Sequence, residues 1–158
     1  MEIELVKTLI DKISSTYNIS SQEIIDKLQA PSDAIDAAAF SIDALSPTEV
    51  LVKYLREKKF NKFSEIARFL KRSQNTIQTT YNNAQKKHPK VLSFTNSNIN
   101  VPLSIFSSEK FTVFESLVRY LRDSKNMTNR DIAVILKKSN KTIWTVYSRA
   151  KLKLRENE

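Results

Sequence analysis

Glycine and cysteine are both absent from this sequence of 158 residues, and proline occurs only four times. Glycine supplies positive φ angles at little cost in tight turns, so its absence argues against a hairpin-rich β fold. It also excludes the glycine-rich loops that hold phosphates in nucleotide-binding proteins. Without cysteine the chain has no disulfide and no thiolate metal ligand. Turns must therefore be made by asparagine, serine, aspartate and lysine.

Long apolar runs and catalytic groupings are lacking as well. No apolar stretch approaches the ~20 residues that a transmembrane helix needs, and the mixed charge of "MEIELVKTLIDK" is unlike a signal peptide. We therefore expect a cytoplasmic protein with no membrane partner. His88 is the only histidine, and neither paired carboxylates nor a Ser/His/Asp grouping stands at a suggestive spacing. We expect no enzymatic activity, no metal and no cofactor.

Charge is divided unevenly along the chain. When Lys and Arg are counted against Asp and Glu, the net charge is −5 for residues 1–45, +8 for residues 46–90 and +6 for residues 91–158. An acidic head followed by two basic parts indicates a polyanion as the partner of the basic parts. The solvated surface of an ordinary basic protein would also account for the charge taken alone.

The two basic parts contain two copies of one sequence. Residues 46–87 align with residues 112–153 at a constant offset of 66, without a gap, and 18 of the 42 pairs are identical. The stretch "SQNTIQTTYNNAQKKH", from Ser73, falls on "SNKTIWTVYSRAKLKL", from Ser139. The chain therefore contains an internal duplication. Phe40 falls on Phe106 at the same offset, so the match is expected to extend upstream.

Each copy predicts three short helices. The first helix begins with a capping box, at Ser46 or Thr112, and a third box at Thr128 begins the second helix of the second copy. Ser73 and Ser139 are good N-caps for the third helices. Apolar residues at helical spacing are expected to be buried. They are Leu51, Val52, Leu55, Ile66, Ala67, Leu70, Ile77, Tyr81 and Ala84, and in the second copy Leu117, Val118, Leu121, Ile132, Ala133, Leu136, Ile143, Tyr147 and Ala150.

The predicted fold class is all-α. Two helices joined by a turn of three or four residues, the second capped by serine, form the helix-turn-helix pattern. We predict an acidic helical N-terminal region over residues 1–45 and a first three-helix helix-turn-helix module over residues 46–90. We also predict a linker over residues 91–106 and a second, tandem module over residues 107–158.

The stretches "SEIARFLKRSQNTIQTTYNNAQKK" and "RDIAVILKKSNKTIWTVYSRAKLKL" resemble a known group. They are similar to the DNA-binding domain of LuxR-type regulators and to the C-terminal domain of bacterial sigma factors. Those families carry E-I-A-x-x-L, then S-x-x-T-V, then a basic tail often written S-R-A-x-x-K-L. The resemblance covers roughly residues 46–87 and 112–155, and implies that each third helix reads DNA. Those families usually have glycine in the turn. Here Lys71 and Lys137 begin the two turns, so we expect either a more open turn or cations that lie along a phosphate backbone.

A polar face is expected on each third helix once its apolar residues are buried. Asparagine and glutamine can pair with adenine, arginine with guanine, and threonine methyls or aromatic rings can contact thymine methyls. A run of amides on an exposed helix is hard to explain by solvation, which Glu and Lys serve better. The candidate base-reading residues are Gln74, Asn75, Gln78, Thr79, Asn82 and Asn83, and in the second copy Asn140, Lys141, Trp144, Thr145, Ser148 and Arg149.

Phosphate contacts give affinity without sequence information and call for cations and helix N-termini. The candidates for these contacts are Lys71, Arg72, Ser73, Lys86 and Lys87, and in the second copy Lys137, Lys138, Ser139, Lys151 and Lys153. A solvated surface charge is the alternative interpretation for each lysine.

The linker and the head are less informative. Apolar residues of the linker are expected to pack back on the modules: Val91, Leu92, Phe94, Val101, Leu103, Ile105 and Phe106. The head begins with an amphipathic helix, followed by a faint third copy in which Ser21–Leu28 falls on Phe63–Leu70 and Ile35 on Ile77. The head is either a helical cap of the first module or a contact surface, for a homodimer through residues 1–45 or for another partner.

The sequence favours a protein that binds double-stranded DNA, a nucleoid-associated transcription regulator. Two linked modules would read a bipartite site, and because their reading faces differ the site should not be a true palindrome. A sigma-like factor or adaptor that binds RNA polymerase is one alternative. A nucleoid-packaging protein without sequence preference is the other.

Overall fold

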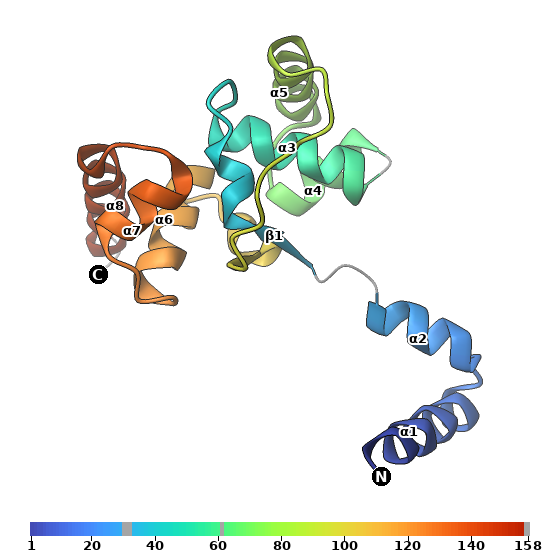
Figure 1. Ribbon diagram of the computed structural model, residues 1–158. Coiled ribbons are helices and arrows are strands. Elements are labelled where there is room, and N and C mark those ends of the chain that lie inside the picture. The colour runs from blue at the N-terminus through green and yellow to red at the C-terminus, as the bar shows by residue number, and fades with distance from the viewer. Residues whose placement is uncertain (30–32, 61, 157–158) are drawn as a thin grey trace. The chain divides into compact units, whose positions relative to one another are not determined.

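The computed structural model describes residues 1–29, 33–60 and 62–156 (Figure 1). The chain divides into two compact units, Met1–Asp33 and Ala34–Glu158. The expected boundary at residue 45 is therefore moved to residue 33. Residues 34–45 belong to the second unit because Ile35, Phe40 and Leu45 are buried in its core.

The first unit contains helices α1 (Glu2–Tyr17) and α2 (Ser21–Gln29). Helix α1 ends at Asn18, which takes the left-handed conformation, and Ser20 caps α2 by accepting a hydrogen bond from the Glu23 N–H at 3.1 Å. All of α1 is described, and none of its residues is buried. The predicted amphipathic helix is thus present, and within the first unit α2 does not bury its apolar face.

The second unit consists of two repeats with the same order of elements. The first repeat contains strand β1 (Ala34–Asp36), the 3-10 helix η1 (Ala37–Ser41) and helices α3 (Pro47–Lys58), α4 (Phe63–Leu70) and α5 (Gln74–Lys87). The second contains β2 (Asn100–Pro102), η2 (Leu103–Phe106), α6 (Val113–Asp123), α7 (Asn129–Leu136) and α8 (Asn140–Arg155). Each element of the second repeat begins 66 residues after its counterpart, so the predicted upstream extension of the duplication is confirmed.

Capping fixes where these helices begin. The Ser46 hydroxyl accepts from the Glu49 N–H at 3.2 Å, and the Glu49 carboxylate accepts from the Ser46 N–H at 2.9 Å. The same reciprocal pairs occur at Thr112 and at Thr128. All three predicted capping boxes are therefore confirmed. Each one satisfies two backbone N–H groups that would otherwise lack a partner.

The two repeats share one hydrophobic core. Every residue that was expected to be buried is buried, except Tyr81 and Tyr147, which are half-buried against the core. Helix α3 of the first repeat packs on α6 of the second, and the rings of Phe40 and Phe106 lie 5.9 Å apart. The repeats are therefore not independent modules joined by a flexible linker.

Much of the predicted linker is part of this core. Residues 100–102 form a strand and residues 103–106 a 3-10 helix, with Val101, Leu103 and Phe106 buried. Leu92, Phe94 and Ile105 pack partly buried against the core, but Val91 is 60% exposed, so its expected packing is wrong. The Asp36 carboxylate ties the segment down by accepting from the Ser97 N–H at 3.1 Å and the Ser97 hydroxyl at 2.7 Å.

The mostly helical prediction is confirmed, with a small addition. Strands β1 and β2 form a two-stranded antiparallel sheet that the sequence did not predict. The prediction of a faint third copy in residues 1–45 is wrong. That copy required a third helix around Ile35, but Ile35 lies in strand β1 and the alanines after it form the 3-10 helix η1. At offset 66, Ile35 is the counterpart of Val101.

Candidate nucleic-acid interface

Helices α5 and α8 begin in the same way. Ser73 accepts a hydrogen bond from the Thr76 N–H at 3.2 Å, and Ser139 accepts one from the Thr142 N–H at 3.1 Å. The two hydroxyls proposed for phosphate contact are therefore already used as N-caps. The first backbone N–H groups of each helix have no intrahelical acceptor, and the helix dipole favours an anion at that end.

The turn before each of these helices is made by a lysine in the left-handed conformation. Lys71 has φ 53° and ψ 49°, and Lys137 has φ 52° and ψ 48°. The Arg72 and Lys138 N–H groups donate back to carbonyls of α4 and α7, at 2.9 and 3.0 Å. Both turns close as a glycine turn would, so the expectation of a more open turn is wrong. The lysines accept a conformation that costs a non-glycine residue about 1 kcal/mol.

The outward faces of α5 and α8 carry the predicted base-reading residues. All six candidates on α5 are exposed, from Gln74 to Asn83. On α8, Thr145 and Ser148 are half-buried and the other four are exposed. The buried side of α8 includes Val146, which sequence reasoning missed, while Tyr147 reaches the surface and donates to the Asp123 carboxylate at 2.7 Å. This hydrogen bond raises the pKa of the Tyr147 hydroxyl.

Trp144 points away from the core and is 61% exposed. It lines a shallow apolar hollow along the C-terminal half of α8 together with Leu152, which is 57% exposed, and Lys151 and Arg155. Leu152 and Arg155 were not predicted as site residues. Helical spacing could have identified them, because they stand eight and eleven positions after Trp144 and therefore lie on the same face of the helix. Exposed indole and leucine side chains side by side indicate a contact surface.

Two of the candidate phosphate lysines have partners within the protein. The Lys87 Nζ lies 2.8 Å from the Glu49 Oε1, and the Lys153 Nζ lies 2.6 Å from the Glu115 Oε2. The four residues are counterparts at offset 66, so the same ion pair ties α5 to α3 and α8 to α6. Burial raises the pKa of the Glu49 carboxyl, but hydrogen bonds from Lys87 and the Ser46 backbone outweigh burial and hold it below its ordinary value. These lysines thus position the helices α5 and α8.

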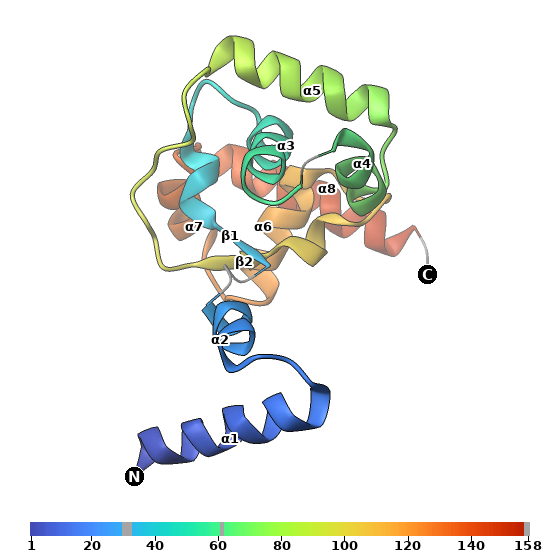
Figure 2. The ribbon, with the colours of Figure 1, turned by 90° about the vertical axis from the view of Figure 1, so that its right-hand side faces the viewer.

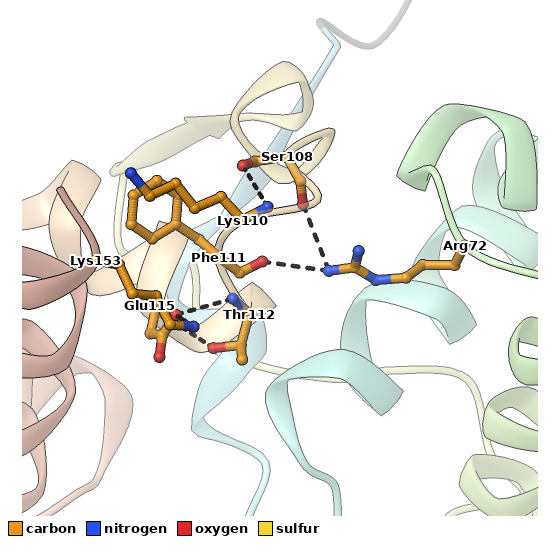
Figure 3. A network of polar contacts seen from close by, with 7 residues as sticks. All are labelled: Arg72, Ser108, Lys110, Phe111, Thr112, Glu115 and Lys153. Atoms are coloured by element: carbon orange, nitrogen blue, oxygen red, sulfur yellow. Dashed lines mark hydrogen bonds and ion pairs between the residues drawn. The ribbon is translucent and has the colours of Figure 1, made fainter. Parts of the chain in front are cut away.

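Arg72 also has a role inside the protein. Its guanidinium donates to the Phe111 carbonyl at 3.2 Å and to the Ser108 carbonyl at 3.4 Å, on the segment that leads into α6 (Figure 3). Figure 3 shows this link between the repeats beside the Thr112 capping box and Lys153. The arginine therefore holds the turn before α5 against the second repeat, a role that its charge alone did not reveal.

The remaining candidate cations are available at the surface. Lys71, Lys86, Lys137 and Lys151 are exposed, and Lys138 is half-buried. Residues 34–158 have a net charge of +12, whereas residues 1–33 have a net charge of −3. The positive charge is thus concentrated on the unit that carries α5 and α8.

Comparisons with known proteins do not assign this chain to a family. No protein-family model matches it, and neither the curated proteins nor the solved structures include a significant match. In residues 1–29, 33–60 and 62–156 no helix is both long enough and apolar enough to cross a membrane. The same described ranges contain no cluster of three His, Cys, Asp or Glu side chains that could hold a metal ion.

Proposed function

We propose that this protein binds double-stranded DNA through two helix-turn-helix modules and acts as a nucleoid-associated transcription regulator in the cytoplasm. In this proposal α4–α5 and α7–α8 are the two motifs, and α5 and α8 lie in the major groove. The observation that carries it is the repeated pairing of a left-handed lysine turn with a serine-capped helix that presents a polar outward face. That face is rich in amides on α5, whereas on α8 it carries one amide, Asn140, together with Lys141 and Arg149.

The strained turns support this assignment. A residue held at positive φ costs free energy, and such strain is retained where a function requires it. Glycine would relieve the strain, yet lysine stands in both turns, at Lys71 and Lys137. A lysine there stands two residues before the N-cap of α5 or α8, and in this docking geometry DNA phosphates are contacted near that end of the helix. A need for positive charge in the turn thus explains why lysine stands at positions 71 and 137, where glycine would be more stable.

A protein partner is the second candidate, and the hollow at Trp144 and Leu152 favours it. An adaptor or sigma-like factor that binds RNA polymerase would cover this apolar surface with polymerase rather than with thymine methyls and sugars. Retention of polymerase on immobilised protein, with no affinity of the isolated protein for duplex DNA, would support this alternative over the first.

Tryptophan fluorescence tests the DNA proposal directly, because Trp144 is the only tryptophan. The free protein should emit at long wavelength, and duplex DNA should quench or shift the emission. If about four phosphates are contacted, the affinity should fall roughly a hundredfold between ~50 and ~200 mM salt, because counterions are released on binding. Emission that saturating DNA leaves unchanged, together with an affinity independent of salt, would refute the proposal.

A further inference from the structure

The register of the small sheet relates the two repeats in a particular way. Ile35 is paired with Val101, its own counterpart at offset 66. Ala34 is paired with Pro102 and Asp36 with Asn100, so each end of β1 meets the counterpart of the opposite end. An antiparallel pair with this register has a two-fold axis through the Ile35–Val101 pair. A translation from one repeat to the next would not produce it.

Part of the rest of the interface has the same property, although α7 also packs on η1 and α4 makes no contact of similar extent with η2. Phe40 contacts Phe106, and α3 contacts α6, and in both cases an element meets its own counterpart. Contacts of this kind define an isologous interface, in which a surface packs on a second copy of itself. The symmetry is approximate, since Arg72 links the repeats on one side and Lys138 occupies its place on the other. The second unit therefore has the organisation of a two-fold dimer within one chain.

The arrangement of α5 and α8 follows from this axis. In Figure 1 both helices are seen end-on, on either side of α3 and α6. In Figure 2 α5 runs from right to left, whereas α8 ends on the right, beside the C-terminus. The two helices thus run in opposite directions in this view, as helices perpendicular to a two-fold axis do.

We propose that the DNA site of this protein consists of two unlike half-sites in inverted orientation about a common centre. This inference rests on the proposed function and adds the orientation, which the tandem sequence alone leaves open. Duplex DNA has two-fold axes perpendicular to its length. When two reading helices are related by a two-fold axis that coincides with one of these, each helix contacts one half-site, and the two half-sites are inverted relative to each other. A direct repeat would require α5 and α8 to be related by translation along the DNA.

The reading faces explain why the half-sites are unlike. Thr79 and Thr145 are counterparts and identical, but the other five positions of the face differ between the repeats. The five pairs are Gln74 and Asn140, Asn75 and Lys141, Gln78 and Trp144, Asn82 and Ser148, and Asn83 and Arg149. The backbone is approximately two-fold symmetric, and the surface proposed to read the bases is not.

A variant with two identical reading faces tests the orientation. It carries Gln74→Asn, Asn75→Lys, Gln78→Trp, Asn82→Ser and Asn83→Arg in the full chain, all at exposed positions of α5. Both proteins are used to select bound sequences from random duplex DNA. The wild type should select an asymmetric site, and the variant a palindrome built from one half-site. Reversing one half-site of either selected sequence should weaken binding by at least tenfold.

A reciprocal variant guards against loss of folding. It carries Asn140→Gln, Lys141→Asn, Trp144→Gln, Ser148→Asn and Arg149→Asn, and it should select a palindrome of the other half-site. Selection of a direct repeat, or of a single half-site, by either variant would overturn the inverted arrangement and leave DNA binding standing. If the wild type enriches no sequence and shows no affinity for duplex DNA, the proposed function fails as well.

Discussion

Lys137 is the residue at which stability and the proposed function oppose each other most clearly. Its backbone lies in the left-handed region, at φ 52°, its side chain is exposed, and it stands two residues before Ser139, the N-cap of α8. Glycine would relieve the strain but remove the ammonium. Asparagine also tolerates this conformation and carries no charge, which gives a second way to separate the two effects.

We predict that Lys137→Gly raises the free energy of unfolding by roughly 0.5–1 kcal/mol and weakens DNA binding. Denaturant unfolding and a DNA titration on the same samples measure the two quantities. Lys137→Asn should weaken DNA binding to a similar extent, because the charge is the common loss. A glycine variant that is less stable than the wild type would show that the left-handed lysine is not strained.

Arg149 and its counterpart Asn83 offer a matched pair for base recognition. Both are exposed on the reading faces, so alanine should leave the fold unchanged. Arg149→Ala is expected to lose about 1–3 kcal/mol of binding free energy and to relax the preference at one base pair. Asn83→Ala should cost less, because an arginine can form a bidentate, charge-assisted contact with guanine. Binding measured on a set of single-base variants checks both, and a larger loss for Asn83→Ala would reverse the ranking.

At the scale of the elements, helices α3 and α6 are each fixed by one glutamate that does two things. Glu49 and Glu115 complete a capping box at the start of their helix and also pair with a lysine near the end of α5 or α8. The start of α3 is therefore tied to the end of α5, and the start of α6 to the last turns of α8. The position of α5 and α8 depends on the charge of these carboxylates.

Acid should weaken this arrangement. The pKa of Glu49 in the folded protein lies below its ordinary value of 4.5, so its ionisation adds stability that is present above that value and is lost as pH falls through the folded pKa. We predict that the free energy of unfolding of Glu49→Gln falls less than that of the wild type between pH 7 and pH 3. Glutamine retains the capping box, so equal pH dependence would mean that the ion pair with Lys87 adds no stability.

The sequence predicted some of these elements and not others for physical reasons. Helices with apolar spacing and a capping box, such as α3 and α6, are specified by neighbouring residues, and so is the outward face of α5. Strand β1 has three residues and no visible period, and its partner lies in the other repeat. Arg72 and Lys153 likewise find their partners 36 to 39 residues away in the chain. A surface charge and a charge paired across the fold look alike in the sequence.

At the scale of the whole molecule, the acidic unit and the basic unit differ in what their surfaces offer. Ile3, Val6, Ile10 and Ile13 alternate at spacings of three and four residues along α1, the spacing of a helix that packs on another helix. Ile3 is 75% exposed, so α2 leaves this face of α1 uncovered within the first unit. We expect a second copy of the chain to cover it, because the same spacing on both helices is self-complementary.

Deleting residues 1–33 tests this division of roles. The remaining unit has its own core, so it should stay folded and bind DNA at least as tightly as the full chain, since a net charge of −3 has been removed. Its mass in solution should correspond to one chain, and the mass of the full protein to two. Light scattering and a DNA titration give both answers. A truncated protein that is folded and monomeric but no longer binds DNA would contradict the assignment of the contacts to the second unit.

The pairing of Ile35 with Val101 has a consequence for dose response. A homodimer separates when it is diluted, so at low abundance its occupancy of a target rises with the square of the number of chains. The two halves of the second unit belong to one chain and share one core, so dilution does not separate them. Under the proposed function, occupancy by this unit would rise in simple proportion to copy number, and a few molecules per cell would act without first having to find one another.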